Sequence, residues 1–382
     1  MKRLIIILAS GLIASTSVHA QDEEKLVIKP SGRILVDAGL FDAKQQNDKL
    51  NDGVAIPDMR IGAGISYGQW KAKIDMGYSY GKVNMKDVWL QYNFNEKNFL
   101  RAGYFIHQYG LQSSTSSSFK ESMEEPHSNQ AFNNSRMIGV MYQHTGDKLL
   151  ATASLFTEND ALKMTSDQLG NQGVGAMSRI VYHPLDEPGN IFHIGISGAI
   201  ESPRYNSDDD LNHHSFTIKT TWPTRIANVT AQQAVVTEAK TMYKFTPEIL
   251  FSKGRFGIEG QYFLNNIQRK GDLKSFTGSG AYCTLRGLLK GREYSYTKTD
   301  GGLATPAPGS MEVVLQYNYT DLSDGDAGIR GGRLNDWSAT YNYYINKYMI
   351  WRVRASWTKV TDREGYENNE VSILETRLQI KF

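Results

Sequence analysis

Charged side chains occupy every second position in several segments of the chain, opposite an equally regular set of apolar ones. Because successive side chains of a β-strand point to opposite faces, each of these segments would gather its charges on one face. Nine basic residues fall on that face: Arg33, Arg60, Lys71, Lys73, Arg101, Arg352, Arg354, Arg377 and Lys381. Five acidic residues share it: Asp37, Asp58, Asp75, Asp87 and Glu375. The face therefore carries an excess of positive charge.

Such a face could select anions if it lined a narrow aqueous passage, because rings of charged side chains set the selectivity of a pore. Arginine and lysine replace part of an anion's hydration shell without trapping it when several weak sites follow one another. We therefore predict an anion path on this face, with Arg60 as its strongest candidate. The alternative is that the same charges pair across neighbouring strands and only satisfy the wall of the sheet.

Other motifs in the sequence give weaker signals. His213 and His214 follow three aspartates, but no second ligand cluster stands at a defined spacing, so a solvated loop tip is the better interpretation. The Gly-x-Gly pairs lack the third glycine of a dinucleotide-binding fingerprint. The single cysteine, Cys283, excludes an internal disulfide framework and a CxxC site, and we interpret it as a small buried residue. We expect no enzymatic activity, no metal and no cofactor.

The same alternation defines the elements that must position the charges. It runs over segments of about ten residues separated by turn residues, and no long stretch has helical spacing. A soluble sandwich would turn the apolar face inward, whereas a transmembrane barrel turns it toward lipid and lets charged residues and glycine line the lumen. The 21 Tyr and 6 Trp favour the barrel, because aromatic residues form girdles at membrane interfaces. A mean hydropathy of −0.44 excludes a bundle of apolar transmembrane helices.

Connection lengths support an all-β, antiparallel transmembrane barrel. Four connections are short enough for tight turns: 68–69, 95–97, 146–147 and 254–255. Four others are long and polar: 42–55, 107–133, 158–171 and 293–309. Outer-membrane barrels combine short periplasmic turns with long extracellular loops, and we assign the two sets accordingly. We predict 16 strands, with 18 possible, because residues 215–253 hold an uncertain number.

The start of the chain has the features of an export signal. Residues 1–20 combine a basic start, an apolar core and a small-residue cleavage site, so we expect a signal peptide cleaved after Ala20. Residues 21–30 would then form a short periplasmic leader and residues 31–382 the barrel, in the outer membrane of a diderm bacterium. Cleavage removes two of the 42 basic residues and leaves 40 against 40 acidic ones, so nucleic acid is not an expected partner.

The other end of the chain supports the same location. Phe382 closes an amphipathic strand with apolar residues at every second position before it. A terminal aromatic residue of this kind resembles the signal by which the barrel-insertion machinery recognises outer-membrane proteins. We therefore predict Phe382 as the insertion signal.

Several blocks of sequence, taken in their order along the chain, indicate membership of one protein family. They are residues 83–92 (VNMKDVWLQY), 100–111 (LRAGYFIHQYGL), 115–117 (TSS), 306–319 (PAPGSMEVVLQYNY), 342–346 (NYYIN) and 377–382 (RLQIKF). Together they resemble the phosphate-selective porin O and P family, over nearly the whole mature chain. The resemblance implies a 16-stranded trimeric outer-membrane channel that prefers anions, phosphate or polyphosphate among them.

The resemblance also implies roles for particular residues. Asp87 matches an acidic residue that orients a neighbouring lumen cation, and Lys120 lies in the third long loop, where the family places a constriction lysine. Two positions depart from the family pattern. Arg60 stands alone where the family often has adjacent arginines, and Gln108-Tyr109 replaces a Pro-Phe pair.

The leading hypothesis is a porin for passive diffusion of small hydrophilic solutes, with a preference for anions. Its partners would be outer-membrane lipid, small anions and two further copies in a homotrimer. A general, non-selective porin and a surface barrel that acts as adhesin or receptor are the alternatives, and a barrel enzyme is disfavoured because no catalytic constellation appears. Whether the loop 107–133 folds into the lumen stays open, because its three acids and Lys120 suit either place.

Overall fold

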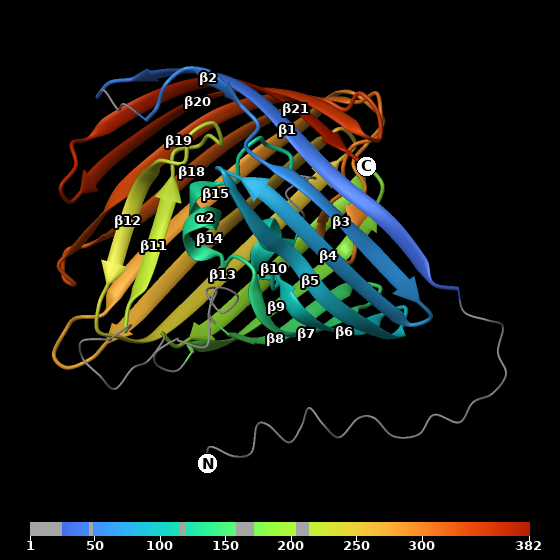
Figure 1. The fold of residues 1–382 in the computed structure, drawn as a ribbon, viewed down its shortest axis with the longest axis horizontal. Coiled ribbons are helices and arrows are strands. Elements are labelled where there is room, and N and C mark those ends of the chain that lie inside the picture. Colours follow the sequence, from blue (N-terminus) through green and yellow to red (C-terminus); the bar gives the residue numbers. More distant parts are fainter. Residues whose placement is uncertain (1–24, 46–48, 115–119, 158–171, 204–213) are drawn as a thin grey trace, which may run out of the picture.

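A closed antiparallel β-barrel forms the body of the protein (Figure 1). The computed structural model describes residues 25–45, 49–114, 120–157, 172–203 and 214–382. Sixteen strands make up the wall: β1 (Val27–Ala43), β3 (Met59–Tyr67), β4 (Trp70–Ser79), β5 (Lys82–Asn95), β6 (Asn98–Phe105), β7 (Met137–Thr145), β8 (Leu149–Thr157), β9 (Val174–Glu187), β10 (Asn190–Glu201), β13 (Ala239–Lys253), β14 (Phe256–Arg269), β15 (Phe276–Lys290), β18 (Met311–Asp324), β19 (Ile329–Tyr343), β20 (Met349–Arg363) and β21 (Asn369–Lys381). Strand β1 pairs with both β3 and β21, which closes the barrel. The predicted barrel of sixteen strands is confirmed.

Smaller elements complete the described chain. They are the short strand β2 (Gly53–Ala55), the hairpins β11 (Phe216–Thr221) with β12 (Thr230–Val236) and β16 (Tyr296–Thr297) with β17 (Gly302–Leu303), and the helices α1 (Gly110–Ser114) and α2 (His127–Phe132). No helix among the described residues is long and apolar enough to cross a membrane. The predicted signal peptide, the loop 158–171 and His213 lie outside the described residues. Strand β1 begins at Val27, within the segment 21–30 that the sequence suggested as a leader.

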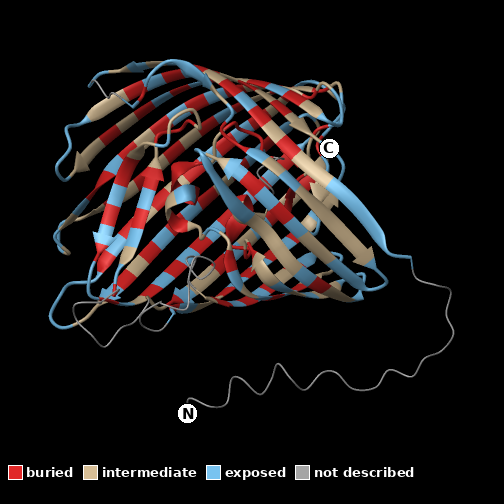
Figure 2. Cartoon of the chain, viewed as in Figure 1, coloured by how far each residue is buried: buried red, intermediate tan, exposed pale blue. Residues whose placement is uncertain are grey.

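Alternation along each strand separates an inner from an outer face. On β20, Arg352 and Arg354 are buried, whereas Trp351 and Trp357 are exposed. Figure 2 shows the same alternation as bands of buried and exposed residues along most strands. Cys283 belongs to the outer face of β15 and is exposed, so the interpretation of a buried cysteine is wrong. Outward side chains are mostly apolar or aromatic, as a lipid-facing surface requires.

The two ends of the barrel differ in their connections. One end, called the turn end here, carries the short turns 68–69, 96–97, 146–148, 188–189 and 254–255. The loop 293–309, which we expected among the long extracellular loops, also lies at the turn end, because it joins β15 to β18 and β15 runs toward that end. We had assigned this loop to the extracellular side from its length, whereas the direction of strand β15 determines the end of the barrel at which it lies.

Three inserted segments fill much of the lumen. The loop from β6 to β7 (residues 106–136) carries α1 and α2, and the connection from β10 to β13 carries the β11–β12 hairpin; both enter from the opposite end, called the loop end. The loop from β15 to β18 enters from the turn end with β16 and β17. Helix α2 packs against the wall through Phe132, whose ring stacks 5.9 Å from that of Phe263. The described parts of the loop 107–133, residues 107–114 and 120–133, are therefore folded inward.

The barrel closes at a seam that involves the last residue of the chain. Phe382 and Gly32 exchange backbone hydrogen bonds of 3.1 and 2.9 Å, which extends the pairing of β21 with β1 beyond the strand. A Cβ atom on Gly32 would collide with the Phe382 ring, so only glycine lets the ring lie over β1 here. Farther along the seam, Asp37 pairs with Arg377.

Candidate functional site

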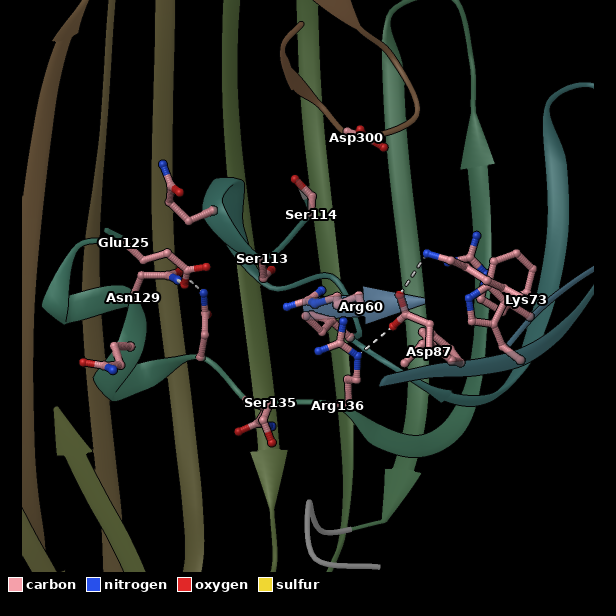
Figure 3. Close-up of a pocket in the computed structure, with 18 of the residues that line it drawn as sticks. Arg60, Lys73, Asp87, Ser113, Ser114, Glu125, Asn129, Ser135, Arg136 and Asp300 are labelled. Carbon is pink, nitrogen blue, oxygen red and sulfur yellow. Dashed lines mark hydrogen bonds and ion pairs between the residues drawn. The ribbon is translucent and has the colours of Figure 1, made fainter. Parts of the chain in front are cut away.

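A cavity of about 600 Å³ lies between the wall formed by β3–β6 and the inserted loop 106–136. Five basic side chains line it: Arg60, Lys73, Arg101, Arg136 and Arg225. Three acidic side chains line it as well: Asp87, Glu125 and Asp300. Figure 3 shows how the strand wall, the inserted loop and the turn-end loop contribute these groups. The lining of this cavity therefore carries an excess of positive charge.

Asp87 organises two of the cations. Its carboxylate accepts a hydrogen bond of 2.7 Å from Arg136 Nε and one of 3.3 Å from Lys73 Nζ (Figure 3). Lys73 also lies 2.7 Å from Asp75 Oδ2 on the same strand. Both cations are thereby held at the cavity wall in a defined orientation, and their charge is partly offset.

A second carboxylate, that of Asp58, is shared by three guanidinium groups. Arg60 donates to it at 3.2 Å through Nε, Arg33 donates to it as well, and Arg225 Nη1 lies 3.9 Å away. Arg225 is also bound by Glu124 at 3.2 Å, so three guanidinium groups meet two carboxylates and the cluster keeps a net positive charge. Arg60 and Arg225 keep 17% and 23% of their side-chain surface exposed, so an anion in the cavity can reach them, whereas Arg33 is buried.

Arg101 contributes a charge without a carboxylate partner among the described residues. Its guanidinium donates two hydrogen bonds of 2.9 and 2.7 Å to Gln91 Oε1 and lies 4.2 Å from the centre of the Trp89 ring. The amide and the ring fix its position while leaving its net charge intact. Arg101 therefore presents a full positive charge to the part of the cavity nearer the turn end.

The remaining predicted cations lie away from this cavity. Arg352 donates to the Ser122 carbonyl at 3.0 Å and Arg354 to the Pro223 carbonyl at 2.9 Å, so both hold inserted segments against the wall. Lys120 is 6% exposed and donates to Gln112 Oε1 at 2.9 Å, behind the surface that faces the cavity. Lys71 is exposed on β4 and is absent from the cavity lining.

The predicted acids are also divided. Asp75 and Asp87 lie beside Lys73. Asp37 is fully buried at the seam, where Arg377 binds it through Nε at 2.8 Å and Nη2 at 2.6 Å. The same Arg377 donates to Glu124 Oε1 at 2.8 Å and to the Met123 carbonyl at 2.6 Å. One side chain thus ties the inserted loop to the seam of the barrel.

Sequence reasoning missed Arg136 and Arg225, and it left open the place of Glu124, one of the three acids of the loop 107–133; all three residues lie on inserted segments rather than on strands. Glu124 accepts from Arg225 Nε at 3.2 Å. Burial raises the pKa of Glu124, but the Arg225 and Arg377 guanidinium groups outweigh this effect and hold it below its usual range. Alternation along strands carries no signal for these three residues. Only the position of Arg136 directly before the alternating segment of β7 could have suggested a place in the lumen.

The turn-end loop is held by a buried ion pair. Arg179 Nη2 lies 2.6 Å from Glu248 Oε1, and both side chains are fully buried. Arg179 also donates to the carbonyl oxygens of Asp300 at 2.7 Å and Gly301 at 3.0 Å. The neighbouring Thr299 carbonyl accepts from Gln108 of the inserted loop at 3.3 Å. This network fixes Asp300 at the turn-end side of the cavity (Figure 3).

The arrangement can attract and pass small anions. It offers several cations in sequence along a water-accessible space, held by carboxylate, amide or ring partners and not enclosed by a ligand cage. Among the residues that the structure describes, no group of three or more His, Cys, Asp or Glu side chains could hold a metal ion.

Comparisons with known proteins agree with this architecture. Porin O of Pseudomonas aeruginosa is 22% identical over 95% of this chain and 90% of its own length. An uncharacterized protein of Caulobacter vibrioides is 25% identical over 81% of this chain and 64% of its own. Among solved structures, the anion-selective porin from Comamonas acidovorans superposes with a TM-score of 0.57 at 12% identity, covering 94% of this chain and all of that one. OmpT of Vibrio cholerae superposes with a TM-score of 0.58 at 8% identity, covering 95% of this chain and all of that one.

The family assignment rests on the whole barrel. The model of the family described as phosphate-selective porin O and P matches residues 28–382, from the first strand to the terminal phenylalanine. The resemblance inferred from short blocks of sequence is therefore confirmed: the chain belongs to the phosphate-selective porin O and P family.

Proposed function

We propose that this outer-membrane porin passes small anions, phosphate among them, by passive diffusion along the cavity beside β3–β6. The observation that carries the proposal is the charge of the cavity lining, where five basic side chains face three acidic ones. Arg33 and Asp58 lie just behind this lining and add one charge of each sign, so the excess of two positive charges is kept when they are counted. The family description supports phosphate as a solute.

The positions of the cations along their strands indicate a sequence of weak sites. Arg136 directly precedes β7 and Arg60 is the second residue of β3, so both lie toward the loop end. Lys73 and Arg101 are each three residues from the start of β4 and β6, toward the turn end. An anion that moves from the loop end would reach Arg136 and Arg60 first and then pass to Lys73 and Arg101, and no single site would retain it.

Assembly and insertion belong to the same proposal. One structure of OmpT of Vibrio cholerae, which shares this fold, is described as a trimer form, and we extend a homotrimer to this chain. The apolar outer face suits outer-membrane lipid as the surrounding medium. Phe382, which completes the pairing of β21 with β1, would present the terminal signal to the insertion machinery.

The test is the reversal potential of the purified protein in a planar bilayer across a KCl gradient, repeated with phosphate in place of chloride. We expect anion preference in the wild type and a fall of about threefold in the anion-to-cation permeability ratio for Arg60→Ala, as for a unit charge about 6 Å from the permeating ion in screened water. Lys274→Ala, which removes an exposed charge from the β14–β15 turn, is the matched control and should leave the ratio unchanged. A cation-selective wild type would overturn the proposal, and an unchanged ratio in Arg60→Ala would remove Arg60 from the path.

A further inference from the structure

Asp300 differs from the other acidic residues of the cavity in having no cationic partner among the described residues. Asp87 is bound by Arg136 and Lys73, and Glu125 lies 4.0 Å from Lys120. The carboxylate of Asp300 accepts only a long hydrogen bond of 3.4 Å from the Thr299 hydroxyl. Its charge is therefore not cancelled locally and acts on ions in the cavity.

The backbone around Asp300 is held rigidly, so the side chain stays at the cavity. The Asp300 and Gly301 carbonyls both accept from Arg179, which the fully buried Glu248 locks in place. The Gly301 N–H closes a turn by donating to the Thr297 carbonyl at 2.8 Å. Figure 3 shows Asp300 at the tip of this loop, beside the space that Arg60, Lys73 and Arg136 line.

The surroundings of Asp300 make its charge matter for ions that pass. The groups that share the cavity with it are the cations Arg60, Lys73, Arg101, Arg136 and Arg225 and the acids Asp87 and Glu125. Arg101 of β6 and Arg179 of β9 are the cations whose fields reach the Asp300 carboxylate. An ion moving toward the turn end thus passes the last lining cation, Arg101, close to an uncompensated negative charge.

We propose that Asp300 is a specificity-determining residue of this channel, which limits anion preference at the turn-end side of the cavity and raises that preference when its charge is removed. This inference rests on the proposed function of the same cavity. A negative charge at this place lowers the energy barrier for cation passage. It also weakens the binding of anions at Arg101, which favours conduction because the last site must release its ion. The loop that enters from the turn end would then set selectivity as well as narrow the lumen.

The pH dependence follows from the burial of the same group. Burial raises the pKa of Asp300, and hydrogen bonding by Thr299 and the charges of Arg179 and Arg101 offset this only in part. As the pH falls, Asp300 therefore becomes neutral earlier than an exposed aspartate. Acidification should make the wild-type channel more anion-selective, and a variant without this carboxylate should lose that part of the response.

The experiment compares Asp300→Asn with the wild type by reversal potential across a KCl gradient, at neutral pH and through a series of acidic pH values. We expect the chloride-to-potassium permeability ratio to rise about threefold at neutral pH, as for removal of one charge about 6 Å from the ion in screened water. Asp300→Glu, which keeps the charge, should stay near the wild-type ratio. Asp272→Asn removes an exposed carboxylate at the loop end and is the matched control.

Each outcome decides a different claim. Equal ratios in Asp300→Asn and Asp272→Asn would overturn the role of Asp300, as would equal effects of Asp300→Asn and Asp300→Glu, which would indicate a disturbed loop instead of a lost charge. A wild type without anion preference would overturn the proposed function. The direction in which Asp300→Asn shifts the permeability ratio would still test the role of Asp300. The absence of any channel current would overturn both.

Discussion

Replacing Arg377 with methionine tests whether one buried side chain anchors the inserted loop to the barrel seam. Arg377 is 4% exposed and binds Asp37 on β1 and Glu124 on the loop, with distances of 2.6 and 2.8 Å from Nη2. Methionine has a similar length and no charge. The substitution leaves Asp37, which is fully buried, without a cationic partner among the described residues, whereas Glu124 keeps Arg225.

The expected loss follows from that difference. Breaking a buried ion pair by removing one partner costs about 3–5 kcal/mol, because the other charge stays buried without compensation. We expect the free energy of unfolding of Arg377→Met to fall by this amount. The double variant Asp37→Asn/Arg377→Met should recover part of the loss, because the stranded charge is gone.

The assay is urea unfolding of the refolded protein in detergent micelles, followed by tryptophan fluorescence. The control is Arg333→Met, which breaks a surface ion pair: Arg333 is 49% exposed and lies 3.0 Å from Asp321 at the loop end. A pair of this kind contributes less than about 1 kcal/mol. The reasoning is refuted if Arg377→Met destabilises no more than Arg333→Met, or if the double variant is no more stable than Arg377→Met alone.

Two further predictions address the seam and the turn-end loop. Deleting Phe382 should lower the amount of folded protein in outer-membrane fractions, because it removes the terminal aromatic ring and two hydrogen bonds to Gly32. The measurement is heat-modifiable gel mobility, and Phe382→Tyr is the control. Normal levels of the truncated protein would contradict the insertion signal. Glu248→Gln should raise single-channel conductance and current noise, because Arg179 loses the carboxylate that holds it under the loop 291–310; recordings identical to the wild type would show that this loop is anchored by other contacts.

The strand wall was largely predictable from the sequence, because its signal is local. Alternation in residues 70–79 and 374–382 depends only on the period of a strand, and it placed Lys73 and Arg377 on the inner face. Connection lengths supported a barrel, and the count of alternating segments allowed sixteen or eighteen strands, of which we predicted sixteen. The same alternation placed Arg60 on the face that lines the cavity.

The inserted segments were not predictable in this way, because nothing local marks a loop that turns into a lumen. Arg136 and Arg225 reach the cavity only through the path of their loops, and Lys120, expected at a constriction, is buried and does not line the cavity. The position of the loop 293–309 at the turn end depends on the direction of every strand before it.

The sequence by itself determined which strand residues face inward, since a strand's period of two assigns each side chain to a face without reference to the rest of the chain. Tertiary structure alone decided which inward-facing charged side chains are exposed to water and which are buried against inserted segments. Arg60 and Arg354 have the same inward orientation, yet one lines the cavity and the other is 1% exposed beneath an inserted segment. The physical reason is that the net charge an ion experiences depends on electrostatic interactions between residues far apart in the chain, such as the ion pair of Asp58 with Arg225 and the longer-range effect of Arg101 on Asp300.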